Sequence, residues 1–201
     1  VTIVRNLGSS VVGNPGFKVS QILDLGGAPG GLGIADITGN GALDIVVAES
    51  ISGAFVVLFN DGTGFFAVGS VVPSGPGTKG VNPTDLDNDK DIDVVALNSG
   101  VPGDPSTASV SVHINTLVKG GPFTGFEPGV SYAVGPDPFA LATGDLNGDG
   151  FPEIVTANAG DGTLSLLINR GDGTFEPAVS LDAGGTPTAL ALVDLDGDAA
   201  N

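Results

Sequence analysis

The feature that most constrains this chain is a spacing that recurs four times along it. In each unit a phenylalanine precedes an aspartate by nineteen positions, and a glycine follows that phenylalanine by nine. The pairs are Phe17 and Asp36, Phe66 and Asp85, Phe126 and Asp145, and Phe175 and Asp194. Short β-branched segments such as EIVTAN and TLSLLIN lie between clusters of Gly, Asp and Asn. Four strands in a unit of about 50 residues are typical of propeller blades.

This repeat predicts an all-β fold of propeller blades, each with four antiparallel strands, and almost no helix. We expect about three and a half to four blades in a single segment, residues 1–201, so that the ring is incomplete. The units start near the four phenylalanines, and the first and last units are partial. VTIVRN is expected as a third strand and TALALVD as a first strand. A β-sandwich is the alternative, but it does not require the phase of the repeat to recur.

The middle of the chain carries two insertions. Successive aspartates of the repeat are 49, 60 and 49 positions apart, so one unit is longer than its neighbours. The extra residues fall inside NSGVPGDPSTAS and TLVKGGPFTG, which are rich in Gly, Pro, Ser and Thr. We therefore expect both insertions to be loops.

Composition narrows the class of partner. The chain has 23 acidic residues against 6 basic ones, and its formal net charge is -17. It lacks the basic surface that nucleic acids and anionic membranes require, whereas it suits cations. Cysteine is absent, so disulfides and thiolate metal sites are excluded. No apolar run reaches membrane-spanning length, and we expect no membrane insertion.

Each aspartate of the repeat opens a loop with oxygen-bearing side chains at its first, third, fifth and ninth positions, and the seventh residue can add its backbone carbonyl. Ca²⁺ takes six to eight such oxygens, whereas Mg²⁺ demands a strict octahedron. The predicted ligands are Asp36, Thr38, Asn40, Ala42 and Asp44; Asp85, Asp87, Asp89, Asp91 and Asp93; Asp145, Asn147, Asp149, Phe151 and Glu153; and Asp194, Asp196 and Asp198. Up to four calcium sites follow, and the third loop, DLNGDGFPE, fits the pattern best.

Other interpretations of these loops are weaker. Asp and Asn favour tight turns even without a metal, but four loops in the same phase exceed what turns require. An EF-hand needs a glutamate at position twelve, where the third loop has Thr156, and helices on both sides. The first loop has only two formal charges and should bind more weakly. Lys90 replaces a glycine in the second loop, and a positive φ there would cost roughly 1 kcal/mol.

The third unit, FEPGVSYAVGPDPFALATGDLNGDGFPEIVTANAGDGTLSLLINRGDGTF, resembles FG-GAP/VCBS repeats, the blades of integrin-α-type propellers. The motif D-x-[DN]-x-[DN]-G-x-x-[DE] with its upstream Phe and Pro carries the resemblance, which covers most of the chain at lower fidelity. It implies Ca²⁺ in the loops and a secreted or cell-surface protein, commonly one that acts in adhesion or glycan recognition. Thr38, Asn40 and Lys90 depart from the family pattern.

We expect a non-enzymatic module for adhesion or structural protein-protein interaction. Its partner would be a protein or glycan at the cell surface or matrix, or further copies that complete the propeller. The alternative is a carbohydrate-binding, lectin-like propeller, accessory to a polysaccharide-degrading enzyme. There is no Trp and one Tyr, Tyr132, and few aromatic rings are thus available to stack on a sugar.

Two further features are interpreted as structural. His113, the only histidine, lies in SVSVHIN out of phase with Val110 and Val112, which predicts an exposed strand residue. We therefore expect no catalytic residue, because nucleophile-base arrangements would have this one histidine and no signature motif. Arg170-Gly171-Asp172 is an RGD tripeptide, but the repeat itself places Asn, Gly and Asp in this turn.

Overall fold

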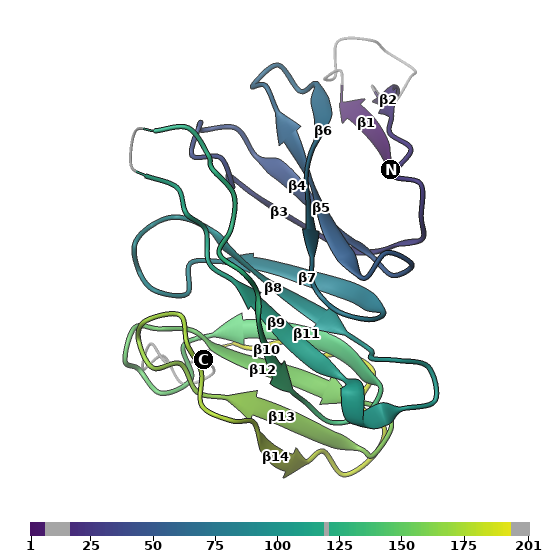
Figure 1. The fold of residues 1–201 in the computed structure, drawn as a ribbon, viewed down its shortest axis with the longest axis vertical. Helices are drawn as coiled ribbons and strands as arrows, with labels where there is room; N and C mark the ends of the chain where they lie inside the picture. The colour runs from purple at the N-terminus through teal and green to yellow at the C-terminus, as the bar shows by residue number, and fades with distance from the viewer. Residues whose placement is uncertain (7–16, 119–120, 194–201) are drawn as a thin grey trace.

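The computed structural model describes residues 1–6, 17–118 and 121–193, which form fourteen strands and one short 3-10 helix. The strands make three four-stranded antiparallel sheets and one two-stranded sheet. The sheets follow one another along the molecule without closing a ring (Figure 1). The prediction of an all-β chain of propeller blades is confirmed. No helix among the described residues is long and apolar enough to cross a membrane.

Each four-stranded sheet is one blade whose strands run in sequence order from the inner to the outer edge. The first blade contains β3 (Pro29–Ala35), β4 (Asp44–Glu49), β5 (Ala54–Asn60) and β6 (Phe66–Pro73). The second contains β7 (Thr78–Thr84), β8 (Asp93–Asn98), β9 (Ser109–His113) and β10 (Val130–Ala133). The third contains β11 (Pro138–Gly144), β12 (Glu153–Asn158), β13 (Thr163–Leu167) and β14 (Val179–Asp182).

The two ends of the chain differ in structure. At the N-terminal end β1 (Thr2–Asn6) pairs with β2 (Phe17–Ile22), with Asn6 opposite Phe17, as expected for the third and fourth strands of a unit. At the other end the expected first strand in TALALVD is wrong, because residues 186–193 form no strand. A strand needs a hydrogen-bonded neighbour, and no second strand of that unit lies among the described residues.

Both predicted insertions are loops. Residues 99–108, between β8 and β9, contain the 3-10 helix η1 (Pro105–Thr107), at whose start the Asp104 side chain accepts the N–H of Ser106. The described residues of the second insertion, 116–118 and 121–125, follow β9, and an isolated bridge between Asn115 and Phe126 closes this connection. The sheets are thereby left intact, because the extra residues extend only their connections.

The blades stack face to face, and apolar side chains fill the space between them. One core cluster joins the first and second blades and includes Val46, Phe55 and Val94. A second joins the second and third blades and includes Val95 and Ile154. Every residue of β8 and β12 is buried, and the first and third blades cover the two faces of β8. This is why the second strands read as continuous apolar runs rather than as alternating patterns.

Glycines let the inner strands of the first two blades approach closely. A Cβ atom on Gly30 would lie 2.5 Å from the Lys79 carbonyl oxygen, and one on Gly33 would lie 2.2 Å from Cδ of Pro83. Any larger residue would separate β3 from β7. The sequence PGGLG therefore serves packing at the inner edge of the arc.

His113 corrects the sequence interpretation, because its side chain is buried and only 1% exposed. Its ring packs edge to face on Phe55 of the first blade, with centroids 5.0 Å apart, and its Nε2 lies 3.1 Å from Oγ of Ser111. Nδ1 has no hydrogen-bond partner among the described residues. The same repeat position holds the buried Leu58 and Leu167 in the other blades. Alternation failed as a guide because both faces of β9 are covered.

We expect His113 to make the protein sensitive to mild acid. Burial lowers the pKa of His113 from 6.5 to about 4, so the unfolded chain binds a proton between these values that the folded chain does not. Stability should fall as the pH drops from 6.5 towards 4, by on the order of 3 kcal/mol from this residue alone. Urea unfolding of wild type and His113→Leu across this range measures it. Equal pH slopes for the two proteins would refute the assignment.

Candidate metal centre

The acidic loops join the first and second strands of each blade, at residues 36–43, 85–92 and 145–152. The first aspartate of each loop organises its backbone. The Asp145 carboxylate accepts the N–H groups of Gly148 and Gly150, both at 2.8 Å. The Asp36 carboxylate accepts the N–H groups of Asn40 and Gly41 in the same way. Each loop therefore curls around its first carboxylate, which brings the following side chains towards a common centre.

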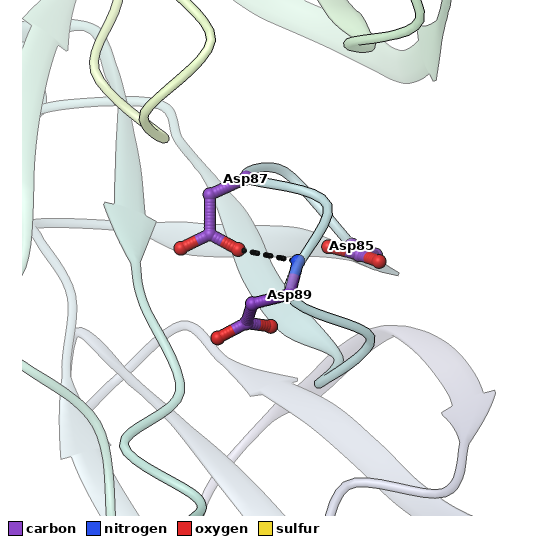
Figure 2. Close-up of side chains that lie close together, drawn as sticks. All are labelled: Asp85, Asp87 and Asp89. Carbon is purple, nitrogen blue, oxygen red and sulfur yellow. Dashed lines mark hydrogen bonds between the residues drawn. The ribbon is translucent and has the colours of Figure 1, made fainter.

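The second loop holds the clearest cluster of acidic side chains. Carboxylate oxygens of Asp85, Asp87 and Asp89 lie within 4.8 Å of one another, and Figure 2 shows the three side chains around the turn. Oδ1 of Asp87 accepts the N–H of Asp89 at 3.2 Å, and Oδ2 of Asp85 accepts the N–H of Lys90 at 3.1 Å. Oδ1 of Asp85 is buried and has no hydrogen-bond partner among the described residues.

The backbone of this loop is strained at two residues. Asn88 has a φ of 63° and Lys90 a φ of 81°, whereas glycines occupy the equivalent positions of the first and third loops. Lys90, which replaces a glycine of the repeat, does adopt the left-handed conformation whose cost was considered from the sequence. Asn is one of the few side chains that tolerate this region, and lysine is not.

Burial disfavours the ionised form of two carboxylates in the second loop, Asp87 and Asp93. Burial, with repulsion from Asp89 and Asp85, raises the pKa of Asp87 above its usual value even though the Asp89 N–H opposes the shift. Burial also raises the pKa of Asp93 to about 7. In the third loop desolvation acts on Asp145 in the same direction, but the N–H groups of Gly150 and Gly148 outweigh it and lower its pKa. A bound cation would favour the ionised forms in the second loop.

The ninth-position carboxylates hold backbone amides. Asp44, Asp93 and Glu153 are all buried, and each accepts N–H groups from two separate stretches of its blade. In the second blade Asp93 accepts the N–H of Leu86 and the N–H of Asn115, both at 2.8 Å. These residues lie outside the three-aspartate cluster, and both oxygens of each already have backbone partners.

The remaining predicted ligands are arranged less tightly. In the third loop the Asn147 amide donates to Oδ2 of Asp149 at 2.9 Å. In the first loop Oγ1 of Thr38 is buried without a hydrogen-bond partner among the described residues. The seventh residues Ala42, Asp91 and Phe151 each donate their N–H to the side chain of the fifth residue. Asp194, Asp196 and Asp198 lie outside the described residues. Within the described part of the chain, three acidic residues meet in this way only in the second loop.

Comparison with known families decides what these blades are. A family model described as an FG-GAP-like repeat matches residues 36–96, 85–156 and 145–200, and each match begins at the first aspartate of a loop. This chain belongs to the FG-GAP-like repeat family. The resemblance inferred from the sequence is confirmed. A search of curated proteins gives no match.

The FG-GAP blades share a contact that the sequence did not reveal. Asn115 donates its side-chain N–H groups to the carbonyls of Ile37 and Ile92, at 2.9 and 3.1 Å. Ile37 belongs to the loop of the preceding blade, so this asparagine joins two blades. Asn169 does the same with Leu86 and Pro152, at 2.8 and 3.1 Å. The only sequence signal was an asparagine at the same phase of each unit.

The RGD tripeptide follows the turn chemistry of the repeat. Nε of Arg170 lies 2.8 Å from Oε1 of Glu176, and Oδ1 of Asp172 accepts both the N–H and the hydroxyl of Thr174. Asp61 and Thr63 form the same pair of hydrogen bonds in the first FG-GAP blade, where there is no RGD. These contacts agree with the structural interpretation of the tripeptide.

A pair of substitutions should separate folding from metal binding within the second loop. Asp93→Ala leaves the buried amides of Leu86 and Asn115 without their acceptor, and we expect a loss of roughly 2 to 4 kcal/mol in the absence of metal. Asp89→Ala removes an exposed carboxylate that accepts the N–H of Asp91, and it should cost less than about 1 kcal/mol. Urea unfolding in EDTA tests both. Similar losses for the two variants would contradict the structural role of Asp93.

Proposed function

We propose that this chain is a non-enzymatic, calcium-binding propeller module of a secreted or cell-surface protein, used for adhesion or structural protein-protein interaction. The observation that carries the metal assignment is the cluster of Asp85, Asp87 and Asp89. Three carboxylates this close repel one another. Lys90 donates its backbone N–H to one of them, Asp85. A divalent cation among them would remove the repulsion and lower the cost of their partial burial.

The residues present fit calcium in the type of donor atom. Every predicted ligand in the second loop offers oxygen, the donor that Ca²⁺ prefers. The buried Oδ1 of Asp85 and Oγ1 of Thr38 both lack hydrogen-bond partners in the described part of the chain, and both belong to predicted ligand positions. Asp85, Asp87, Asp89 and the carbonyl of Asp91 would hold the ion, which would supply positive charge and cross-link the loop. Mg²⁺ fits less well because it demands octahedral geometry and releases its waters reluctantly.

The family supports a binding role without chemistry. FG-GAP-like repeat modules are generally non-catalytic. The buried His113 also bears on this proposal, because its ring is enclosed between two blades and cannot reach a substrate. The net charge of -17 supports cations and proteins with basic surfaces as partners, at the cell surface or in the matrix. We also propose self-assembly, in which a blade of a second copy stacks on an end blade of this chain as the blades stack within it.

A lectin-like role is the second candidate. Tyr132, the only tyrosine that could stack on a sugar ring, already has packing partners. Tyr132 packs against Phe175 with ring centroids 5.7 Å apart, and its hydroxyl accepts the N–H of Phe175. The one tyrosine is therefore engaged in packing. Binding to a glycan array that EDTA abolishes would favour this candidate over protein adhesion.

Calcium should stabilise the protein, and the second loop should contribute to the effect. At a hundredfold excess over the dissociation constant, stabilisation of about 2.7 kcal/mol would raise Tm by about 5 to 10 °C relative to EDTA. Asp87→Asn combined with Asp89→Asn should reduce this shift, and it should raise Tm in EDTA because the repulsion is gone. Differential scanning calorimetry measures both effects.

The matched control for this experiment is Asp182→Asn, which makes the same chemical change at the end of β14. Asp182 accepts the N–H of Gly184 and lies outside the acidic loops, so its variant should keep the full calcium response. A wild-type Tm that is the same with calcium and with EDTA would overturn the metal assignment.

A further inference from the structure

We propose that cation binding in the second loop is positively coupled to cation binding in the third, and that Asn169 and Asn88 are the positioning residues that link them. This inference rests on the proposed calcium sites and concerns how they are regulated. One hydrogen bond connects the two loops directly, between residues 62 positions apart, and a second connects the second loop to Asn169, 83 positions away, which also donates to Pro152 at the end of the third loop. Each bond begins or ends next to a carboxylate of the cluster.

The first link passes through the peptide groups of Leu86. This residue lies between Asp85 and Asp87, and its N–H donates to Asp93 at 2.8 Å within its own blade. Its carbonyl accepts the side-chain N–H of Asn169, at 2.8 Å, from the next blade. Asn169 also donates to the Pro152 carbonyl at 3.1 Å and, through its own N–H, to Glu153 at 3.4 Å. A change in the backbone between Asp85 and Asp87 therefore reaches the end of the third loop.

The second link is the side chain of Asn88. It lies between Asp87 and Asp89 and donates to the Gly150 carbonyl of the third loop at 2.8 Å. The N–H of Gly150 in turn donates to Oδ2 of Asp145, the first predicted ligand of that loop, at 2.8 Å. Asn88 adopts a φ of 63° that glycine would adopt more easily, so the bond to Gly150 accounts for a side chain at a strained position.

The first and second loops give an internal comparison. Asn115 links them as Asn169 links the second and third, through the Ile37 carbonyl at 2.9 Å. The Asn88 position, however, is Gly39 in the first loop, which has no side chain to form the second bond. The coupling should therefore be stronger between the second and third loops than between the first and second.

The physical basis is a shared cost of ordering. An ion among Asp85, Asp87 and Asp89 would fix the peptide groups of the second loop. It would thereby also fix the Leu86 carbonyl and the Asn88 side chain, which form the two hydrogen bonds to the third blade. A second ion then binds a loop whose backbone is already held in place. Linkage requires the effect to be reciprocal, so that occupancy of the third loop strengthens binding in the second by the same factor.

Site-resolved calcium titrations of the chain by NMR test this coupling. The Gly150 amide reports the third loop, and the amides of Asp89 and Lys90 report the second. Disabling the second loop with Asp87→Asn and Asp89→Asn should weaken calcium binding at the third loop by about fivefold, the lower end of measured couplings. Repeating this comparison in an Asn88→Gly background should reduce the effect to about twofold, because only the Asn169 link remains.

Glycine occupies the Asn88 position in both sister loops, so Asn88→Gly is expected to fold, and amide dispersion in the same spectra verifies it. The control is Asn82→Ala, which removes a different hydrogen bond between the same two blades, to Oγ1 of Thr143 at 3.1 Å, outside the acidic loops; the fivefold effect should persist in it. If calcium shifts no loop amide, the proposed calcium sites themselves fail. If both loops respond but the third is unaffected by disabling the second, calcium binding stands and the coupling is refuted. An undiminished effect in Asn88→Gly refutes the role of Asn88.

Discussion

A buried carboxylate that accepts two backbone N–H groups is the interaction on which each blade depends. Asp93 joins the turn after the inner strand, through Leu86, to the end of the third strand, through Asn115. Loop amides buried between blades need acceptors, and strands cannot supply them at a turn. The carboxylate satisfies two at once, but its own burial is unfavourable without a counter-ion, which is why the pKa of Asp93 rises to about 7. The ninth position is thus required by the fold before any metal binds.

The same peptide groups that close one blade also hold the next. The Leu86 N–H faces inward to Asp93, while its carbonyl accepts Asn169 of the following blade. Ile37 repeats this arrangement with Asp44 and Asn115. Closure of a blade and stacking on its neighbour are therefore not independent, which is the nearest-neighbour behaviour expected of repeat proteins. Apolar clusters between blades supply most of the burial, and these hydrogen bonds fix the register in which the blades pack.

The sequence predicted the features that depend on local phase and missed those that depend on stacking. Spacing alone located the blades, the two loop insertions and the replacement of a loop glycine by Lys90, because turns and strands recur at fixed positions in each unit. His113 was misassigned because alternation identifies an exposed face only when one face of a strand is solvated, and β9 is covered on both. Asn169 stands at the same phase of its unit as Asn60 and Asn115, but spacing does not reveal its partner Leu86, which is 83 positions away and is reached only once the blades have stacked. The segment TALALVD had strand composition without a neighbour to pair with.

Charge and strain coincide in the second loop, and this coincidence argues for function rather than for stability. A chain selected only for a stable turn would place glycine at Asn88 and Lys90, as the sister loops do, and would separate Asp85, Asp87 and Asp89. Each departure costs on the order of 1 kcal/mol, and strain of this kind persists where the surroundings offset it. The strain at Asn88 is offset by the hydrogen bond from its side chain to the Gly150 carbonyl. The three carboxylates accept backbone N–H groups, but no salt bridge among the described residues neutralises them, and a divalent cation is the group whose charge and oxygen preference would do so.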